Sequence, residues 1–241
     1  ISAVTYGTKK IKPVNKVIGP GNQFVSAAKK EVSGDIGIEA MTAGPSEVLI
    51  VADKSSNPEW LASDLLGQAE HDQLAQCILI SKDKNILEKT KKEVFEQLKN
   101  LPRSSIAKKS LMMNGILIYA NSDKKIIEIT NKIGPEHLEL NVKNYKSFVA
   151  KIKNAGSVCL GKYAVMAMTD YGAPGSNHVL PTDSSSKYSS GLNVSEFMKK
   201  ISYITLSKKG IDKLGPSVIT LANYEGLQGH AQSIVKRIRR K

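Results

Sequence analysis

The sequence has few cysteines, few aromatic residues and no long apolar run. Of its 241 residues, two are Cys, one is Trp and 5% are aromatic. Two cysteines are too few for the disulfide framework of a small secreted domain, and no apolar stretch approaches the roughly 20 residues that cross a bilayer. Neither Gly-x-Ser-x-Gly nor Gly-x-Gly-x-x-Gly is present. These absences argue against a disulfide-rich protein, a membrane-spanning protein and a serine hydrolase.

Both cysteines lie in apolar, strand-like runs, Cys77 in residues 76–80 and Cys159 in residues 157–160. Unpaired cysteine is among the residues most often buried in protein cores. We therefore predict two buried free thiols, with a disulfide or a catalytic thiol as the alternatives. Free thiols suit a reducing compartment, so the expected location is the cytoplasm.

The formal net charge of +13 is high. A basic surface can bind nucleic acid or phosphorylated ligands. Here lysine pairs are spread over many segments, and the only dense basic run is residues 236–241. The spread favours solvated helix faces and a basic tail, with no nucleic-acid or membrane partner. A basic nucleic-acid-binding module is kept as the alternative.

The hydrophobic pattern alternates between strand and helix spacing. Continuous apolar runs of the buried, parallel type predict strands, and 3.6-residue periodicity with caps such as Asn57-Pro58 predicts helices. The expected strands are 16–18, 47–52, 76–81, 116–119, 137–142, 157–160 and 203–206. The expected helices are 24–32, 58–72, 83–100, 124–132, 145–153, 208–223 and 227–240, and 161–194 is a long loop. This alternation predicts an α/β fold with a mostly parallel sheet, and polar motifs at the carboxyl ends of strands predict ligand binding there.

The four histidines lie in short polar motifs, which suggests one site assembled from four segments. Gln68 and His71 stand three apart on an expected helix, so both side chains can face one metal ion, although Gln is an unusual zinc ligand. Glu136 and His137 form an adjacent acid/base pair at a turn. The alternatives are a capping or exposed histidine at His71 and a chance pair at 136–137.

The remaining polar motifs are individually weak. Asp170 is a possible metal ligand or an Asx-turn residue, and His178 in the same loop could simply pack there. Glu225 and His230 flank a helix break and could be cap residues. The segments Gly19-Pro20-Gly21-Asn22 and Gly44-Pro45-Ser46 can each be explained as tight turns.

Taken in order, the motifs resemble the histidinol dehydrogenase family. The matching segments are VIGPGN (17–22), AGPSEV (43–48), SDLLGQAEHD (63–72), GPEHLEL (134–140), DY (170–171), NHVLPT (177–182) and EGLxxH (225–230). The resemblance spans nearly the whole chain. It implies NAD-dependent oxidation of L-histidinol to L-histidine through the aldehyde, in two hydride transfers that complete histidine biosynthesis.

The resemblance also implies a role for individual residues. Zinc would be held by Gln68, His71, Asp170 and His230, with His230 supplied by the partner in a domain-swapped homodimer. Glu136 and His137 would be the acid/base residues, and Asn22 would contact NAD. Substrate contacts would come from Ser46, Gln68, His71, His137, Asp170, His178, Glu225 and His230, with Glu225 also from the partner. A related zinc- and NAD-dependent dehydrogenase of another amino alcohol is the alternative.

The same resemblance predicts two interleaved, incomplete Rossmann-like domains and a helical C-terminal tail. Residues 1–47 and 130–187 would belong to one domain and 48–129 to the other, with 188–241 as the swapped tail. The family has a further region before the residue that is Ile1 here. The chain is therefore expected to be the C-terminal portion of a longer enzyme, and this portion alone could be inactive.

Overall fold

The computed structural model describes residues 1–19, 21–39, 44–172 and 177–238. The chain divides into two compact units, Ile1–Glu196 and Phe197–Lys241. No helix in the described ranges is both long enough and apolar enough to cross a membrane.

A five-stranded parallel sheet forms the centre of the first unit. Its order is β5-β4-β3-β6-β7, and every neighbouring pair is parallel. The strands are β3 (Glu47–Ala52), β4 (Gln76–Ser81), β5 (Gly115–Tyr119), β6 (His137–Asn141) and β7 (Ser157–Leu160). All six residues of β3 are buried, as expected for a central parallel strand that is covered on both faces. The sheet confirms the predicted α/β class.

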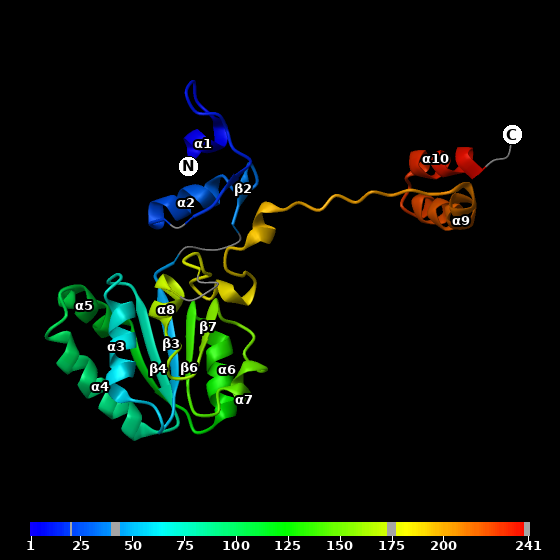
Figure 1. Ribbon diagram of the computed structural model, residues 1–241. Coiled ribbons are helices and arrows are strands. Elements are labelled where there is room, and N and C mark those ends of the chain that lie inside the picture. The colour runs from blue at the N-terminus through cyan, green and yellow to red at the C-terminus, as the bar shows by residue number, and fades with distance from the viewer. Residues whose placement is uncertain (20, 40–43, 173–176, 239–241) are drawn as a thin grey trace. The chain divides into compact units, whose positions relative to one another are not determined.

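Helices cover both faces of this sheet (Figure 1). One face packs against α3 (Pro58–Ala69), α4 (Lys84–Leu98) and α5 (Ser104–Asn114), and the other against α6 (Asp123–Ile133) and α7 (Lys146–Val149). Side chains of a strand alternate between faces, so Val48 and Ile50 join the α3 side whereas Leu49 and Val51 join the α6 side. The same alternation turns His137 and Glu139 toward the α3 side, since Leu138 and Leu140 pack on the α6 side.

Side-chain caps begin several helices of this unit, among them α3 and α6. Asn57 accepts a hydrogen bond from Glu59 N at the start of α3, as the Asn-Pro pair predicted, and Ser122 accepts one from Lys125 N at α6. The sequence pattern did not predict α5. Only Ala107 and Ser110 of this helix are buried, so it carries no apolar stripe from which to infer a helix.

Helix α6 ends at Gly134, which adopts a left-handed conformation with φ 62°. A Cβ at this position would lie 2.8 Å from Ser186 Oγ. We expect Gly134→Ala to lower the free energy of unfolding by about 1–2 kcal/mol, because an L residue is strained in this region. Thermal unfolding followed by circular dichroism would measure the loss. Gly67→Ala, inside α3 and with an ordinary 3.8 Å neighbour, should not destabilise; equal losses in both variants would contradict the prediction.

The N-terminal segment forms α1 (Ser2–Tyr6), α2 (Gln23–Glu31) and a two-stranded parallel pair, β1 (Lys16–Val17) with β2 (Gly37–Ile38). The expected long loop 161–194 contains α8 (Met166–Tyr171) and the short 3₁₀ helix η1 (Ser185–Lys187), and η2 spans Val194–Phe197. The expected domain boundary near residue 130 separates β5 from β6, yet both strands belong to one sheet because β6 pairs with β3.

The second unit is a helical hairpin of α9 (Lys208–Tyr224) and α10 (Gln228–Ile238). The two helices pack closely at Gly215, where a Cβ would lie 2.9 Å from Ile234 Cγ2. The predicted strand at 203–206 is wrong: this segment has no regular secondary structure, and Tyr203 and Ile204 are almost fully exposed. An apolar run can form a strand only where a neighbouring strand is available to pair with it.

Candidate active site

The candidate site lies at the amino ends of β3, β6 and β7. Ser46 immediately precedes β3, Glu136 precedes β6, and His137 pairs in register with Ser157, the first residue of β7. The sequence rule for open α/β sheets predicted that polar motifs such as the segment 44–46 follow the carboxyl ends of strands, and for this segment the prediction is wrong because it precedes β3. The polar segments 44–46 and 134–136 enter their strands instead of leaving them, so their side chains gather at the opposite edge.

His137 is the buried centre of this group. Its Nδ1 lies 3.0 Å from Ser157 Oγ, and its Nε2 lies 3.8 Å from Glu136 Oε1 and 3.9 Å from Asp170 Oδ1. Burial lowers the pKa of His137 to about 4; Asp170 opposes this shift, whereas His71 and His178 add to it. The imidazole is therefore neutral near pH 7 and can accept a proton at one ring nitrogen.

Glu136 is braced by a second buried carboxyl, Glu47, which the sequence analysis missed. Glu47 N donates to Glu136 Oε2 at 3.0 Å, and Glu136 N donates to Glu47 Oε2 at 3.3 Å. Burial is the main cause that raises the pKa of Glu136 to about 8; the Glu47 N–H opposes this shift, whereas the Glu47 and Asp170 carboxylates add to it. A carboxyl that titrates near neutral pH is suited to both donating and accepting a proton. Glu47 could have been recognised in the sequence, because it is a glutamate at the start of an otherwise apolar strand.

A cavity of about 210 Å³ opens beside Glu136, and Gly19, Gly21, Ser46 and His178 are among its lining residues. A buried ion pair contacts the backbone at Gly19. Lys29 Nζ lies 2.5 Å from Glu39 Oε1 and also donates to Gly19 O. The segments that contain Gly19 and Ser46, both singled out in the sequence, therefore line the same cavity as Glu136.

Asn22 caps α2, because its Oδ1 accepts hydrogen bonds from Phe24 N and Val25 N, each at 3.1 Å. This is the tight-turn alternative of the sequence analysis. The contact between Asn22 and NAD stays a prediction.

The expected metal ligands of this unit come from α3 and α8. Helix α3 ends at Ala69, so Gln68 is helical whereas His71, which was expected on the helix, lies in the turn that follows, with His71 N donating to Gln68 O at 3.2 Å. Gln68 is 1% exposed, and neither atom of its side-chain amide has a hydrogen-bond partner among the described residues. An unpaired buried amide costs free energy, so these atoms are placed for a ligand that the chain itself does not supply.

Two of the three expected ligands, His71 and Asp170, are of residue types that commonly bind zinc. His71 and Asp170 are both close enough to His137 to shift its pKa, and imidazole nitrogen and carboxylate oxygen are ordinary zinc ligands. Within the described ranges, no three His, Cys, Asp or Glu side chains converge as a metal cluster. Gln68, His71 and Asp170 include only two residues of those types. Zinc binding by these three residues stays a prediction.

Of the remaining predicted residues, His178 lines the cavity beside Glu136, whereas Glu225 and His230 lie in the second unit. His178 is exposed, and its ring meets Tyr171 edge-on at 5.8 Å between centroids. Residues 173–176 of the same segment lie outside the described ranges. Glu225 and His230 belong to the second unit and are both exposed there, so the first unit does not contain them.

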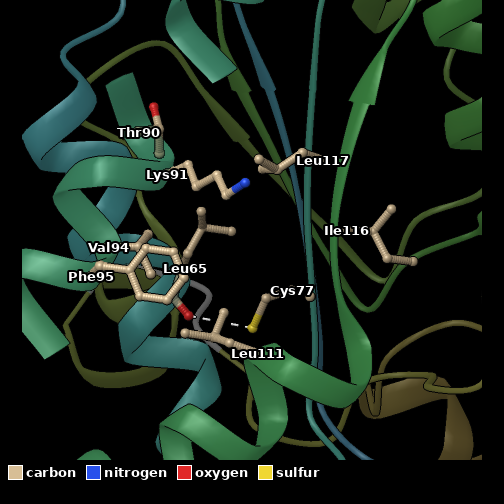
Figure 2. A pocket seen from close by; sticks show the side chains of 10 residues that line it. Leu65, Cys77, Thr90, Lys91, Val94, Phe95, Leu111, Ile116 and Leu117 are labelled. Carbon is tan, nitrogen blue, oxygen red and sulfur yellow. Dashed lines mark hydrogen bonds between the residues drawn. The ribbon is translucent and has the colours of Figure 1, made fainter. Parts of the chain in front are cut away.

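A second hollow, of about 130 Å³, lies between α4, α5 and the β4–β5 strands (Figure 2). It is lined mainly by apolar side chains and contains Cys77, whose Sγ donates to Leu65 O at 3.3 Å. Burial raises the pKa of Cys77 to about 12, and Cys159 is similarly shifted. Both cysteines are free and buried, as predicted, and neither forms a thiolate nucleophile at neutral pH.

Comparisons with known proteins identify the family of this chain. The family model "Histidinol dehydrogenase" matches residues 1–238. Over the whole chain, the sequence is 74% identical to a histidinol dehydrogenase of Pelagibacter ubique, of which it covers 56%. Over 99% of the chain it is 44% identical to that of Zymomonas mobilis, covering 55%.

A solved structure shows the same fold. The crystal structure of histidinol dehydrogenase from Elizabethkingia anophelis superposes on 98% of this chain with a TM-score of 0.92 and 42% identity, and 54% of that structure is covered. The chain spans about half the length of the curated relatives it matches. The chain belongs to the histidinol dehydrogenase family.

Proposed function

We propose that the protein carrying this chain oxidises L-histidinol to L-histidine through L-histidinaldehyde, with two NAD⁺ and one zinc ion per site, as the last steps of histidine biosynthesis. The observation that carries the proposal is the position of the neutral His137. Its Nε2 lies 3.8 Å from Glu136 Oε1 and 3.9 Å from Asp170 Oδ1. The buried amide of Gln68, which has no hydrogen-bond partner among the described residues, gives further support, as does the match to a family named for histidinol oxidation.

Gln68, His71 and Asp170 would hold the zinc ion, with His230 as the fourth ligand. When bound, zinc fixes the orientation of the substrate's nitrogen atoms and NAD⁺ takes up the hydride lost in each oxidation. Ser46 and His178 line the cavity from opposite segments and would contact the substrate. Asn22, at the glycine turn of the same cavity, would contact NAD⁺.

His137 would accept the hydroxyl proton of the substrate on Nε2 as the carbon is oxidised. Ser157 Oγ, 3.0 Å from Nδ1, holds the ring so that Nε2 faces the group formed by Glu136 and Asp170. Because burial keeps the imidazole neutral, no prior deprotonation is needed. His137 would return the proton to solvent before the next turnover.

Glu136 would act as the base for the water that converts the aldehyde to its hydrate. As base, its carboxylate takes one proton from the attacking water, while the remaining hydroxyl bonds to the carbonyl carbon. The hydrate then loses a second hydride and its remaining acidic proton to give the carboxylate product. A pKa of about 8 places Glu136 near the value that favours proton transfer in both directions.

The partner is proposed to be a second copy of the protein in a domain-swapped homodimer. Glu225 and His230 would then reach the site of the other subunit. The support is indirect: large apolar side chains of the second unit and its lead-in are exposed, among them Tyr203, Ile204 and Tyr224 at 84–90%. Exposed apolar surface of this kind is usually covered by a partner. A cytoplasmic location remains a prediction.

The direct test is NADH formation from L-histidinol by the full-length protein after zinc loading. We expect absorbance at 340 nm to rise with two NADH formed per L-histidine released. A zinc-loaded protein that reduces NAD⁺ with another amino alcohol but not with L-histidinol would establish the alternative dehydrogenase. Salt-sensitive binding of DNA or RNA in a protein with no zinc content would favour the nucleic-acid module instead.

A further inference from the structure

Two carboxyl groups behind the candidate site take no part in the chemistry proposed above. Asp64 of α3 and Glu139 of β6 lie close enough for each carboxyl group to shift the pKa of the other. Glu139 is fully buried, and its Oε1 accepts a 2.7 Å hydrogen bond from Met166 N at the start of α8. Asp64 Oδ2 and Glu139 Oε2 receive no N–H or hydroxyl donor within the described ranges. Two carboxyl groups in this position can form a hydrogen bond with each other only by sharing one proton.

This pair connects three elements that carry the site. Asp64 lies four residues before Gln68 on α3, Glu139 lies two residues after His137 on β6, and Met166 lies four residues before Asp170 on α8. Four residues of α-helix rise about 6 Å, and two residues of strand span about 6.6 Å. Both α3 and α8 run from the height of Glu139 toward the amino end of β6. Because four helical residues and two strand residues cover nearly the same length, Gln68 and Asp170 reach the height of His137.

We propose that the Asp64–Glu139 pair is a positioning unit that sets the register of α3 and α8 against β6, and thereby places Gln68 and Asp170 beside His137. The inference deepens the proposed function and rests on it for the identity of the ligands. Burial raises the pKa of Asp64 to about 6 and of Glu139 to about 8, which agrees with a shared proton near neutral pH. Partners behind metal ligands commonly control metal affinity in this way.

The test is the affinity of the metal-free, full-length protein for Co²⁺, followed by visible absorption without substrate. Asp64→Ala and Glu139→Ala should weaken Co²⁺ binding by about 10–100-fold. Asp64→Asn and Glu139→Gln keep a donor and an acceptor across the pair, so we expect both to bind Co²⁺ within about threefold of the unmodified protein. Glu139→Asp shortens the side chain by about 1.5 Å and should weaken binding as the alanine variants do, which keeps the test available if those variants do not fold.

Ser110→Ala is the matched control, because Ser110 of α5 donates a buried 2.9 Å hydrogen bond to Ala75 O that involves neither Asp64 nor Glu139. It should lower the melting temperature and leave Co²⁺ binding unchanged. Alanine variants that bind Co²⁺ normally, or amide variants that bind as weakly as alanine, would overturn the proposal. A protein that binds Co²⁺ but leaves L-histidinol unoxidised would refute the proposed function and leave this test intact.

Discussion

His71→Ala should remove the bound zinc and abolish turnover, whereas His137→Ala should keep the zinc and turn over slowly. His71 lies in the turn that follows α3, where its backbone N–H donates to Gln68 O, and it would ligate the metal, so its loss leaves too few ligands. His137 is held by Ser157 and would act as the base. Loss of a general base commonly slows an enzyme by about 10²–10⁴-fold. Zinc content by atomic absorption and steady-state NADH formation would separate the two roles.

Ser63→Ala is the control for this pair of variants. Ser63 is exposed on the same helix as Gln68 and bonds Gln97 at 2.8 Å, so both zinc content and turnover should be retained. Equal zinc loss in His71→Ala and His137→Ala would show that the ligand and the base have been assigned to the wrong residues. Full zinc in His71→Ala would remove His71 from the proposed ligand set.

The parts of the fold that the sequence predicted are those where one local pattern decides the structure. The limits of β3, β4 and β7 match the predicted runs because their apolar stretches are continuous and end in polar turns. The segment 203–206 shows the limit of this reasoning: its apolar residues resemble a strand, but pairing depends on a neighbour that a local pattern does not contain. The same holds for α5, whose buried face is formed by small residues.

Which residues form the candidate site stays a prediction, whereas the end of the sheet predicted for the segment 44–46 is wrong. Each single motif could be explained either by function or by structure. Only the resemblance of the ordered motifs to one family assigned them to a common site. The edge of the sheet on which they meet depends on the direction in which each loop enters its strand, and on α8 returning Asp170 toward His137. The supporting carboxyls Glu47 and Glu139 lie inside apolar strands. A buried glutamate in such a run requires a partner, and that requirement could have singled both out.

Glu139→Gln should make the protein more stable than its parent at pH 8, and the difference should shrink toward pH 5. Burial first, and then the Asp64 carboxylate, raises the pKa of Glu139 from 4.5 to about 8. The folded state therefore binds an extra proton between these values, and the free energy of unfolding falls as the pH rises through them. The slope is at most about 1.4 kcal/mol per pH unit, so the difference can grow by at most about 4 kcal/mol between pH 5 and pH 8. The amide does not ionise and can still accept from Met166 N while donating to Asp64.

Thermal or urea unfolding at pH 5, 6.5 and 8 would measure this difference. Glu136 and Glu47 also have raised pKa values, so both proteins should lose stability with pH, and only the difference between them reports Glu139. Asp64 and Cys159 both lie near Glu139. The Cys159 thiol, with a pKa of about 12, stays neutral throughout this pH range. Glu88→Gln, an exposed carboxyl on α4, should show no such divergence. Parallel curves for Glu139→Gln and its parent would mean that Glu139 is ionised in the folded protein, because only a proton held on Glu139 makes the two curves separate.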